Sequence, residues 1–152
     1  YNMPVSVSKV FIHLIFSTNN REAWFVNDDI REEMFKYIAG ILNGRKCPPI
    51  IVGGERDHIH ALFLMNREDS ISKIVREVKT SSSLWFKQTT RRSAFAWQSG
   101  YAAFSVSKSK LETVRQYILN QAEHHRRKSF QEEFIEFLNV YEVEYDPKHL
   151  WD

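Results

Sequence analysis

Residues 48–65 read PPIIVGGERDHIHALFLM, and this stretch contains two apolar runs separated by a short polar segment. The apolar runs are residues 50–52 and residues 59–65, and each predicts a buried strand. Gly53 and Gly54 begin the segment between them, as expected for a turn. The stretch therefore predicts two consecutive strands joined by a turn.

The sequence on the N-terminal side predicts a strand followed by a helix. Apolar residues occupy both sets of alternating positions over residues 10–16, which is typical of a strand buried on both faces. Asp28 or Asp29 is the expected N-cap of a helix that ends at Asn43-Gly44. Its apolar stripe has helical spacing and comprises Ile30, Met34, Ile38 and Ile41.

The sequence on the C-terminal side predicts a second helix, a fourth strand and two further helices. Ser70 is the expected N-cap of the second helix, whose inner face comprises Ile71, Ile74, Val75 and Val78. Residues 88–94 are expected to form a loop, and residues 101–106 a strand. The third helix is expected from Leu111 to about residue 127, and the last over residues 130–138.

The order β-α-β-β-α-β is that of the ferredoxin-like, split βαβ fold in the α+β class. It predicts an antiparallel sheet with two helices on one face and additional C-terminal helices. The other sheet face is left for those helices or for a ligand. We expect a single domain over residues 1–152, with an acidic tail at residues 129–152.

Charge is distributed unevenly along the chain. Residues 1–128 contain 20 of the 21 Lys and Arg but only 12 of the 19 Asp and Glu. Residues 129–152 contain Lys148 against seven acidic residues. A basic body suits a polyanionic partner, although an ordinary charged surface with an acidic terminal helix explains the distribution equally well.

Cysteine content and hydropathy restrict the class of protein. Cys47 is the one cysteine, which excludes a disulfide or a cysteine zinc cluster within one chain, and we expect it to be buried. No apolar run approaches the length of a membrane span, and we expect no signal peptide. We therefore expect a cytoplasmic protein with no membrane partner.

His58 and His60 form the first candidate site. Side chains alternate along a strand, so both imidazoles project from the same face. Two neighbouring imidazoles are a good start for a divalent metal site. Two hydrogen-bonded polar residues without a metal are the other reading of this pattern.

Tyr117 and Gln121 form the second candidate site, on the predicted third helix. They are separated by one helical turn and lie at the edge of its apolar stripe. Taken alone, Tyr117 could be an ordinary packing residue and Gln121 an ordinary surface amide. Together with the histidines, they could meet on the uncovered sheet face, where two imidazoles and an amide oxygen suit Mg²⁺ or Mn²⁺.

The sequence resembles the small bacterial transposases of the insertion-sequence 200 and 605 type and the related REP-associated tyrosine transposases. These are HUH enzymes, in which two histidines flank one hydrophobic residue and a single tyrosine is the nucleophile. His58-Ile59-His60 matches the first feature, and residues 114–121, VRQYILNQ, match the second. Supporting matches lie at residues 16–21, 95–101 and 124–126 and in the acidic tail. Asn19 departs from the lysine that similar proteins often carry.

The resemblance implies a metal-dependent single-stranded DNA transposase. Tyr117 would attack a DNA phosphodiester, keep the 5′ phosphate as a phosphotyrosine and release a 3′ hydroxyl. His58, His60 and Gln121 would hold the Mg²⁺ or Mn²⁺ ion, and a 3′ hydroxyl from another strand would rejoin the DNA. The resemblance also implies a homodimer that binds DNA hairpins at the ends of a mobile element in bacteria. The tyrosine helix of one subunit would complete the histidine site of the other.

Residues outside this centre are candidates for DNA contacts. The expected phosphate contacts are Arg21, Arg91, Arg92, Arg126, Arg127 and Lys128, with solvated surface charge as the alternative. Trp97, Tyr101 and Phe104 could stack on exposed bases, but burial in the core or at a dimer interface is the stronger expectation. His13 is expected to be a hydrogen-bonded core histidine.

Two other functions remain open from the sequence. A domesticated relative could bind hairpins without cutting them. A metal-dependent phosphodiesterase could use the histidines while Tyr117 is only structural. Loss or retention of cleavage after removal of the Tyr117 hydroxyl separates these readings.

Overall fold

The protein, analysed as a computed structural model, is described over residues 6–124, 128–140, 143–148 and 150. It divides into two compact units, residues 1–121 and residues 122–152, which we describe separately. The single domain predicted over residues 1–152 stays a prediction. Within the described ranges, no helix combines the length and apolar character that crossing a bilayer requires.

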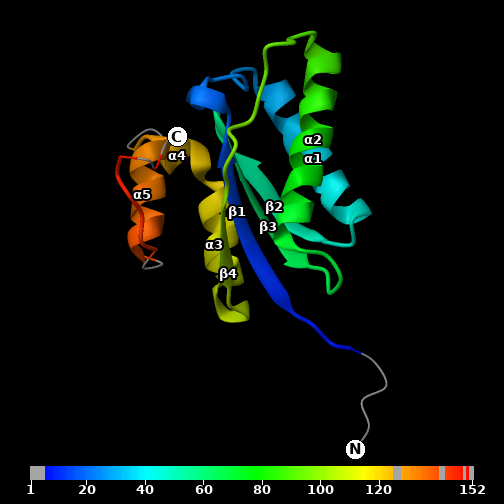
Figure 1. The fold of residues 1–152 in the computed structure, drawn as a ribbon, viewed down its shortest axis with the longest axis vertical. Helices are drawn as coiled ribbons and strands as arrows, with labels where there is room; N and C mark the ends of the chain where they lie inside the picture. Colours follow the sequence, from blue (N-terminus) through cyan, green and yellow to red (C-terminus); the bar gives the residue numbers. More distant parts are fainter. Residues whose placement is uncertain (1–5, 125–127, 141–142, 149, 151–152) are drawn as a thin grey trace, which may run out of the picture. The chain divides into compact units, whose positions relative to one another are not determined.

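The first unit is built on one antiparallel sheet with the strand order β2-β3-β1-β4. Its strands are β1 (Val10–Ser17), β2 (Pro49–Gly54), β3 (His58–Met65) and β4 (Ala102–Val106). β1 and β3 pair at the centre, in a register that places Ser17 opposite His58. A helix separates β1 from β2 and another separates β3 from β4, which confirms the predicted α+β, ferredoxin-like fold (Figure 1).

The first helix, α1, spans Asp28–Gly44 and is capped one residue earlier than predicted. The side-chain oxygen of Asn27 accepts a hydrogen bond from the backbone N–H of Ile30 at 3.1 Å. Asp28 and Asp29 lie in the first turn, where their charge favours the positive end of the helix. The predicted cap was wrong because three adjacent residues of nearly equal capping preference stand together here.

The second helix, α2, spans Ile71–Thr90 and is capped by Ser70 as predicted. It continues through residues 88–90, which were wrongly predicted to belong to a loop. The Thr90 hydroxyl donates to a backbone carbonyl one turn earlier at 2.7 Å, and Arg91 ends the helix at φ 58°. Threonine has weak helix propensity, so the sequence pattern underestimated the helix here.

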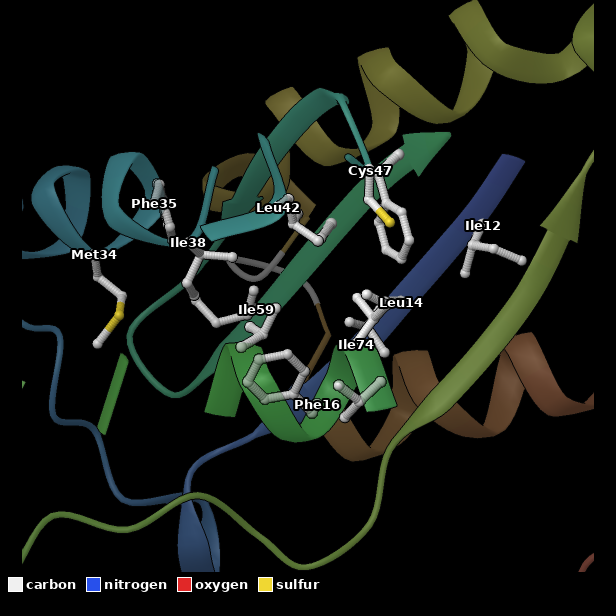
Figure 2. Packing of buried hydrophobic residues seen from close by; sticks show 14 of the residues in the cluster. Ile12, Leu14, Phe16, Met34, Phe35, Ile38, Leu42, Cys47, Ile59 and Ile74 are labelled. Carbon is white, nitrogen blue, oxygen red and sulfur yellow. The ribbon is translucent and has the colours of Figure 1, made fainter. Parts of the chain in front are cut away.

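α1 and α2 cover one face of the sheet and enclose the main core of the first unit (Figure 1). Leu14 and Phe16 of β1 and Ile59 of β3 meet Ile38 of α1 in this core (Figure 2). These side chains are fully excluded from solvent. Cys47 lies in the same cluster, which confirms the expectation of a buried cysteine.

A third helix packs on the opposite sheet face. This helix, α3, spans Leu111–Leu119 and follows a single 3₁₀ turn, η2, at Lys108–Lys110. Ile118 of α3 packs with Leu62 of β3 and Val106 of β4 in a second, smaller cluster. The sheet therefore carries helices on both faces.

The third helix was predicted to run without interruption to about residue 127, and this was wrong. It ends at Leu119, because Asn120 leaves helical geometry at φ −97° and ψ 24°, and a short helix, α4, spans Gln121–His124. The helical spacing of apolar residues continues across the break and conceals it. The second unit contains α5, Phe130–Val140, which confirms the predicted last helix.

Gly53 allows α3 to lie close to β2. A Cβ atom at Gly53 would stand 2.9 Å from Ile118 Cγ2 and 3.2 Å from the Ile118 carbonyl oxygen. We expect Gly53→Ala to lower the free energy of unfolding by about 1–3 kcal/mol, because the added methyl group overpacks this contact. Urea denaturation monitored by circular dichroism measures the change.

Gly40 in α1 offers a matched control, since a Cβ atom there would meet nothing within 4 Å. We expect Gly40→Ala to raise the free energy of unfolding by about 0.5–1 kcal/mol, because alanine is the better helix former. Equal stability of the Gly53→Ala variant and the wild type would contradict the close packing of α3 on β2.

Candidate functional site

His58 and His60 lie on β3, on the sheet face that carries α3. Leu62, two residues further on, belongs to the cluster beneath α3, and alternation along the strand sets both histidines on that same face. Their ring centroids are 5.1 Å apart, and they offer nitrogen atoms within 4.8 Å of each other. This spacing would allow both rings to bind one metal ion.

Asp57, directly before β3, is the hydrogen-bond partner of His58 Nδ1. The Nδ1–H group of His58 donates to Asp57 Oδ1 at 2.7 Å. An ionised carboxylate only accepts hydrogen bonds, so the proton of this hydrogen bond is on Nδ1. A carboxylate paired in this way orients a histidine for a metal at the opposite nitrogen.

A third histidine, His13 on β1, extends the cluster. His13 Nε2 lies 2.8 Å from His60 Nδ1 in a buried side-chain hydrogen bond. The expectation of a buried, hydrogen-bonded His13 is confirmed, but its partner was missed. The sheet register supplies it, because His13 stands opposite Leu62 and is therefore diagonal to His60 on the same face.

Gln121, the first residue of α4, lies on the other side of the His58 ring. Its Oε1 atom is 2.8 Å from His58 Nε2. The contact is a hydrogen bond when Nε2 carries a proton, or when the amide of Gln121 turns its NH₂ group toward an unprotonated Nε2. With the amide oxygen toward an unprotonated Nε2, a divalent cation would be bound by both lone pairs. Two imidazoles and an amide oxygen therefore fit Mg²⁺ or Mn²⁺.

Tyr117 of α3 lies beside His60. The two ring centroids are 5.9 Å apart with an interplanar angle of 74°. The half-buried tyrosine also packs in the cluster with Leu62 and Ile118, which positions its ring on the sheet. The structure thus brings Tyr117 and Gln121 to the histidine pair, although the helix that was expected to carry both is broken between them.

The candidate phosphate contacts occupy three other segments. Arg21 ends the 3₁₀ turn η1 (Asn19–Arg21), and Arg91 and Arg92 are exposed directly after α2. Lys128 belongs to the second unit and pairs with Glu136 at 2.5 Å. Arg126 and Arg127 lie outside the described residues. A role of these residues in DNA binding stays a prediction.

The three candidate stacking residues have different environments. Trp97 packs edge-on against Phe16 at 4.8 Å, and its Nε1–H donates to the Ser82 hydroxyl at 3.0 Å. Phe104 is buried on β4. Tyr101 is 41% exposed, so it is the one member of this trio whose ring offers substantial surface to a ligand.

Several solved structures share this fold, including two that match most of this chain. A candidate transposase from Deinococcus radiodurans R1 superimposes with a TM-score of 0.61 and 20% identity, over 80% of this chain and 97% of the other. A REP-associated tyrosine transposase bound to a REP hairpin superimposes with a TM-score of 0.53 and 15% identity, over 82% and 73% of the two chains. At these identities the likeness establishes the fold.

The sequence itself matches a known family. No curated protein matches the chain significantly. The family model described as transposase IS200 like, however, matches residues 6–121. This range contains His58, His60, Tyr117 and Gln121, and it spans most of the chain. The protein therefore belongs to the IS200-like transposase family.

Proposed function

We propose that the protein cuts and rejoins single-stranded DNA, with Tyr117 as the nucleophile. The observation that carries the proposal is the convergence of Tyr117 and Gln121, from the α3–α4 segment, on His58 and His60 of β3. A phenol beside a set of metal-ligating atoms is the combination that phosphodiester cleavage through a covalent intermediate requires. Membership of the transposase family supports this activity.

His58, His60 and Gln121 would hold the Mg²⁺ or Mn²⁺ ion in this proposal. The bound ion would neutralise charge on the scissile phosphate. Asp57 and His13 engage Nδ1 of His58 and His60 respectively. These two hydrogen bonds would keep the rings oriented, with Nε2 of each directed to the ion.

Tyr117 would attack the phosphorus atom through its phenolic oxygen. As the bond from tyrosine to phosphorus forms, the bond from phosphorus to the 3′ oxygen breaks. The phenol loses its proton and the 3′ oxygen gains one, which leaves the 5′ phosphate on Tyr117 and a 3′ hydroxyl on the DNA. A free phenol has a pKa near ~10, so positive charge nearby must favour the phenolate.

Rejoining reverses this step with a different strand. The 3′ hydroxyl of a second DNA end attacks the phosphotyrosine, restores Tyr117 and forms a new phosphodiester. One phosphodiester is exchanged for another, so the reaction needs no ATP. The sequence accordingly contains none of the glycine-rich loops that bind nucleotide phosphates.

DNA hairpins are the partner that we propose for recognition. A structural neighbour, the REP-associated tyrosine transposase, was solved with a REP hairpin. The excess of Lys and Arg over residues 1–128 suits such a polyanion. Arg21, Arg91 and Arg92 are the described candidates for its phosphates.

The number of chains in one active site is a separate question. The family resemblance implies a homodimer in which the tyrosine helix of one subunit completes the histidine site of the other. The contacts of Gln121 with His58 and of Tyr117 with His60 are, however, formed within one chain. A site that each chain completes by itself is therefore the alternative to the shared site.

The function is tested with single-stranded DNA that carries a hairpin and with Mg²⁺ or Mn²⁺. We expect a protein–DNA species that survives denaturing electrophoresis, and we expect none with a perfect duplex of the same sequence. Binding without cleavage would support the hairpin-binding alternative, and cleavage without a covalent species would support the phosphodiesterase. Equal reaction of duplex and single strand would contradict the proposal.

A further inference from the structure

A surface groove lies between α2 and residues 96–101, which lead into β4. Its volume is about 470 Å³, within the ~300–1,000 Å³ of small-ligand sites. Three cationic side chains line it, Arg76, Lys79 and Lys87, and its lining contains no Asp or Glu. Two other surface pockets of the protein each contain two carboxylates beside their cationic side chains. This groove, which we name the α2 groove, therefore has an unbalanced positive charge.

Arg76 and Lys87 present their charges to the groove from one face of α2. Residues 76, 80, 83 and 87 follow helical spacing, and all four line the groove. Within the described part of the chain, neither cation forms an ion pair or a side-chain hydrogen bond. A ligand phosphate could thus pair with both cations without breaking any of the ion pairs or side-chain hydrogen bonds that the described residues form.

Lys79 lies deeper in the α2 groove and fixes its shape. Its ammonium group donates to the backbone carbonyls of Gln98 at 2.8 Å and Gly100 at 2.6 Å. Burial lowers the pKa of Lys79 to about 8, because no carboxylate offsets the loss of solvation. An anion in the groove would supply the missing counter-charge.

Tyr101 adds an aromatic surface to these charges. Its ring is 41% exposed, and the ammonium of Lys79 lies 6.0 Å from the ring centroid. Cations beside an exposed aromatic ring are the combination by which proteins hold single-stranded nucleic acid. A base must be unpaired and unstacked to lie on such a ring, so duplex DNA does not fit this arrangement.

The α2 groove and the histidine pair lie at the same end of the sheet. The Gln98 side chain, in the groove lining, accepts hydrogen bonds from the backbone N–H and hydroxyl of Ser17 at 2.7 and 2.6 Å. Ser17 ends β1 and stands opposite His58, which begins β3. A DNA strand held near His58 would therefore continue past this end of the sheet toward the groove.

We propose that the α2 groove binds single-stranded DNA, with Arg76 and Lys87 contacting backbone phosphates and Tyr101 stacking against a base. The choice of DNA among polyanions rests on the proposed function. The groove would hold the single strand that flanks the cleaved position. It would add affinity that is independent of the metal and of Tyr117.

The phosphate contacts are tested by salt-dependent binding of a fluorescent (dT)₂₀ oligonucleotide, in EDTA so that no cutting occurs. The variant is Arg76→Gln with Lys87→Gln. The control is Lys9→Gln with Lys36→Gln, which changes the net charge equally at two exposed residues outside the groove lining. We expect the groove variant to reduce the slope of log K against log salt by about 1.4, at ~0.7 per phosphate contact.

The expected control slope is that of the wild type. Equal slopes for the groove variant and the control would overturn the phosphate contacts. Both variants should keep the wild-type melting temperature, because Lys9 and Lys36 are exposed and the side chains of Arg76 and Lys87 form no hydrogen bond with any other described residue. If the double variant unfolds, each single substitution is measured instead, with an expected slope change of about 0.7.

The stacking contact is tested by comparing (dT)₂₀ with an abasic oligonucleotide of the same length. We expect the wild type to prefer (dT)₂₀ by about 5- to 100-fold, the range for one stacked base. Tyr101→Leu should remove most of this preference. Equal binding of the abasic oligonucleotide, or of a polyglutamate peptide of equal charge, would assign the groove to acidic partners in general and overturn the proposal.

Failure of this inference differs from failure of the proposed function. If the groove variant binds (dT)₂₀ as the control does while the wild type forms the covalent DNA species, the groove proposal is wrong and the function stands. The wild type could instead form no covalent species while the groove variant shows a smaller slope of log K against log salt than the wild type. The chain would then bind single strands without the proposed chemistry.

Discussion

Tyr117→Phe should abolish the covalent DNA species and reduce cleavage on the order of 10⁶-fold, the scale on which loss of a catalytic nucleophile acts. The substitution removes only the phenolic oxygen, and the ring keeps its packing beside His60 and Ile118. Stability and hairpin affinity should therefore stay within about 1.5 kcal/mol of the wild type, the scale of one hydrogen bond. Denaturing electrophoresis with labelled single-stranded DNA measures the first effect, and urea denaturation the second.

Tyr37→Phe is the matched control for this substitution. Tyr37 of α1 stacks on Trp85 of α2 with ring centroids 4.9 Å apart, and both helices lie on the sheet face opposite α3. Its loss of a hydroxyl should leave the covalent species unchanged. A covalent species formed by the Tyr117→Phe protein would refute the nucleophile assignment. Unchanged cleavage without such a species would instead favour the phosphodiesterase.

His58→Ala and His60→Ala should each reduce cleavage by about 10³-fold or more, because a bound ion contributes several kcal/mol to the transition state. Mn²⁺ binding, measured by electron paramagnetic resonance without DNA, should weaken in parallel. Hairpin affinity should largely persist, since Lys and Arg supply most of it. Measuring hairpin affinity therefore shows whether a variant lost cleavage because it no longer binds the ion or because it no longer binds DNA.

His13→Gln is the graded comparison for these two variants. It removes the partner of His60 Nδ1 but leaves both proposed ligands in place. We expect Mn²⁺ affinity to fall by about 10- to 100-fold, as for other residues that orient a metal ligand. Loss of folding in His58→Ala and His60→Ala, with unchanged Mn²⁺ binding by the remaining folded protein, would mark the histidines as structural.

Mixing the His60→Ala and Tyr117→Phe proteins tests whether one chain completes a site. A site completed within one chain predicts that the mixture stays inactive, because every site then keeps one defect. A shared site would give mixed dimers with one intact site, and cleavage would return in part. Copurification of differently tagged chains must first show that any subunits exchange.

The order of strands and helices was predictable because the sequence marks it locally. Local patterns correctly predicted β1 from the apolar run around residues 10–16 and β3 from the run around residues 59–65. The capping residue Ser70 correctly predicted the start of α2. The prediction was wrong where several neighbouring residues were equally suitable, as for the N-cap of α1, where Asn27 is followed by two aspartates. It also failed at Asn120, where the break leaves the helical spacing of apolar residues intact.

The candidate site was predictable in its members but not in its supporting contacts. His58 and His60 share a face by strand alternation alone, and Tyr117 and Gln121 stood out on the family resemblance. The hydrogen bond of His13 to His60 depends on the register between β1 and β3, which no local pattern reveals. The α2 groove likewise depends on where residues 96–101 return to α2.

The most direct test of the central claim is mass spectrometry of the covalent species after digestion with trypsin. Cleavage after Arg115 and Arg126 releases residues 116–126, QYILNQAEHHR, in which Tyr117 is the only tyrosine and no serine or threonine occurs. The account predicts this peptide joined at Tyr117 to the 5′ phosphate of the DNA fragment. DNA joined to any other residue, or through a 3′ phosphate, would contradict it.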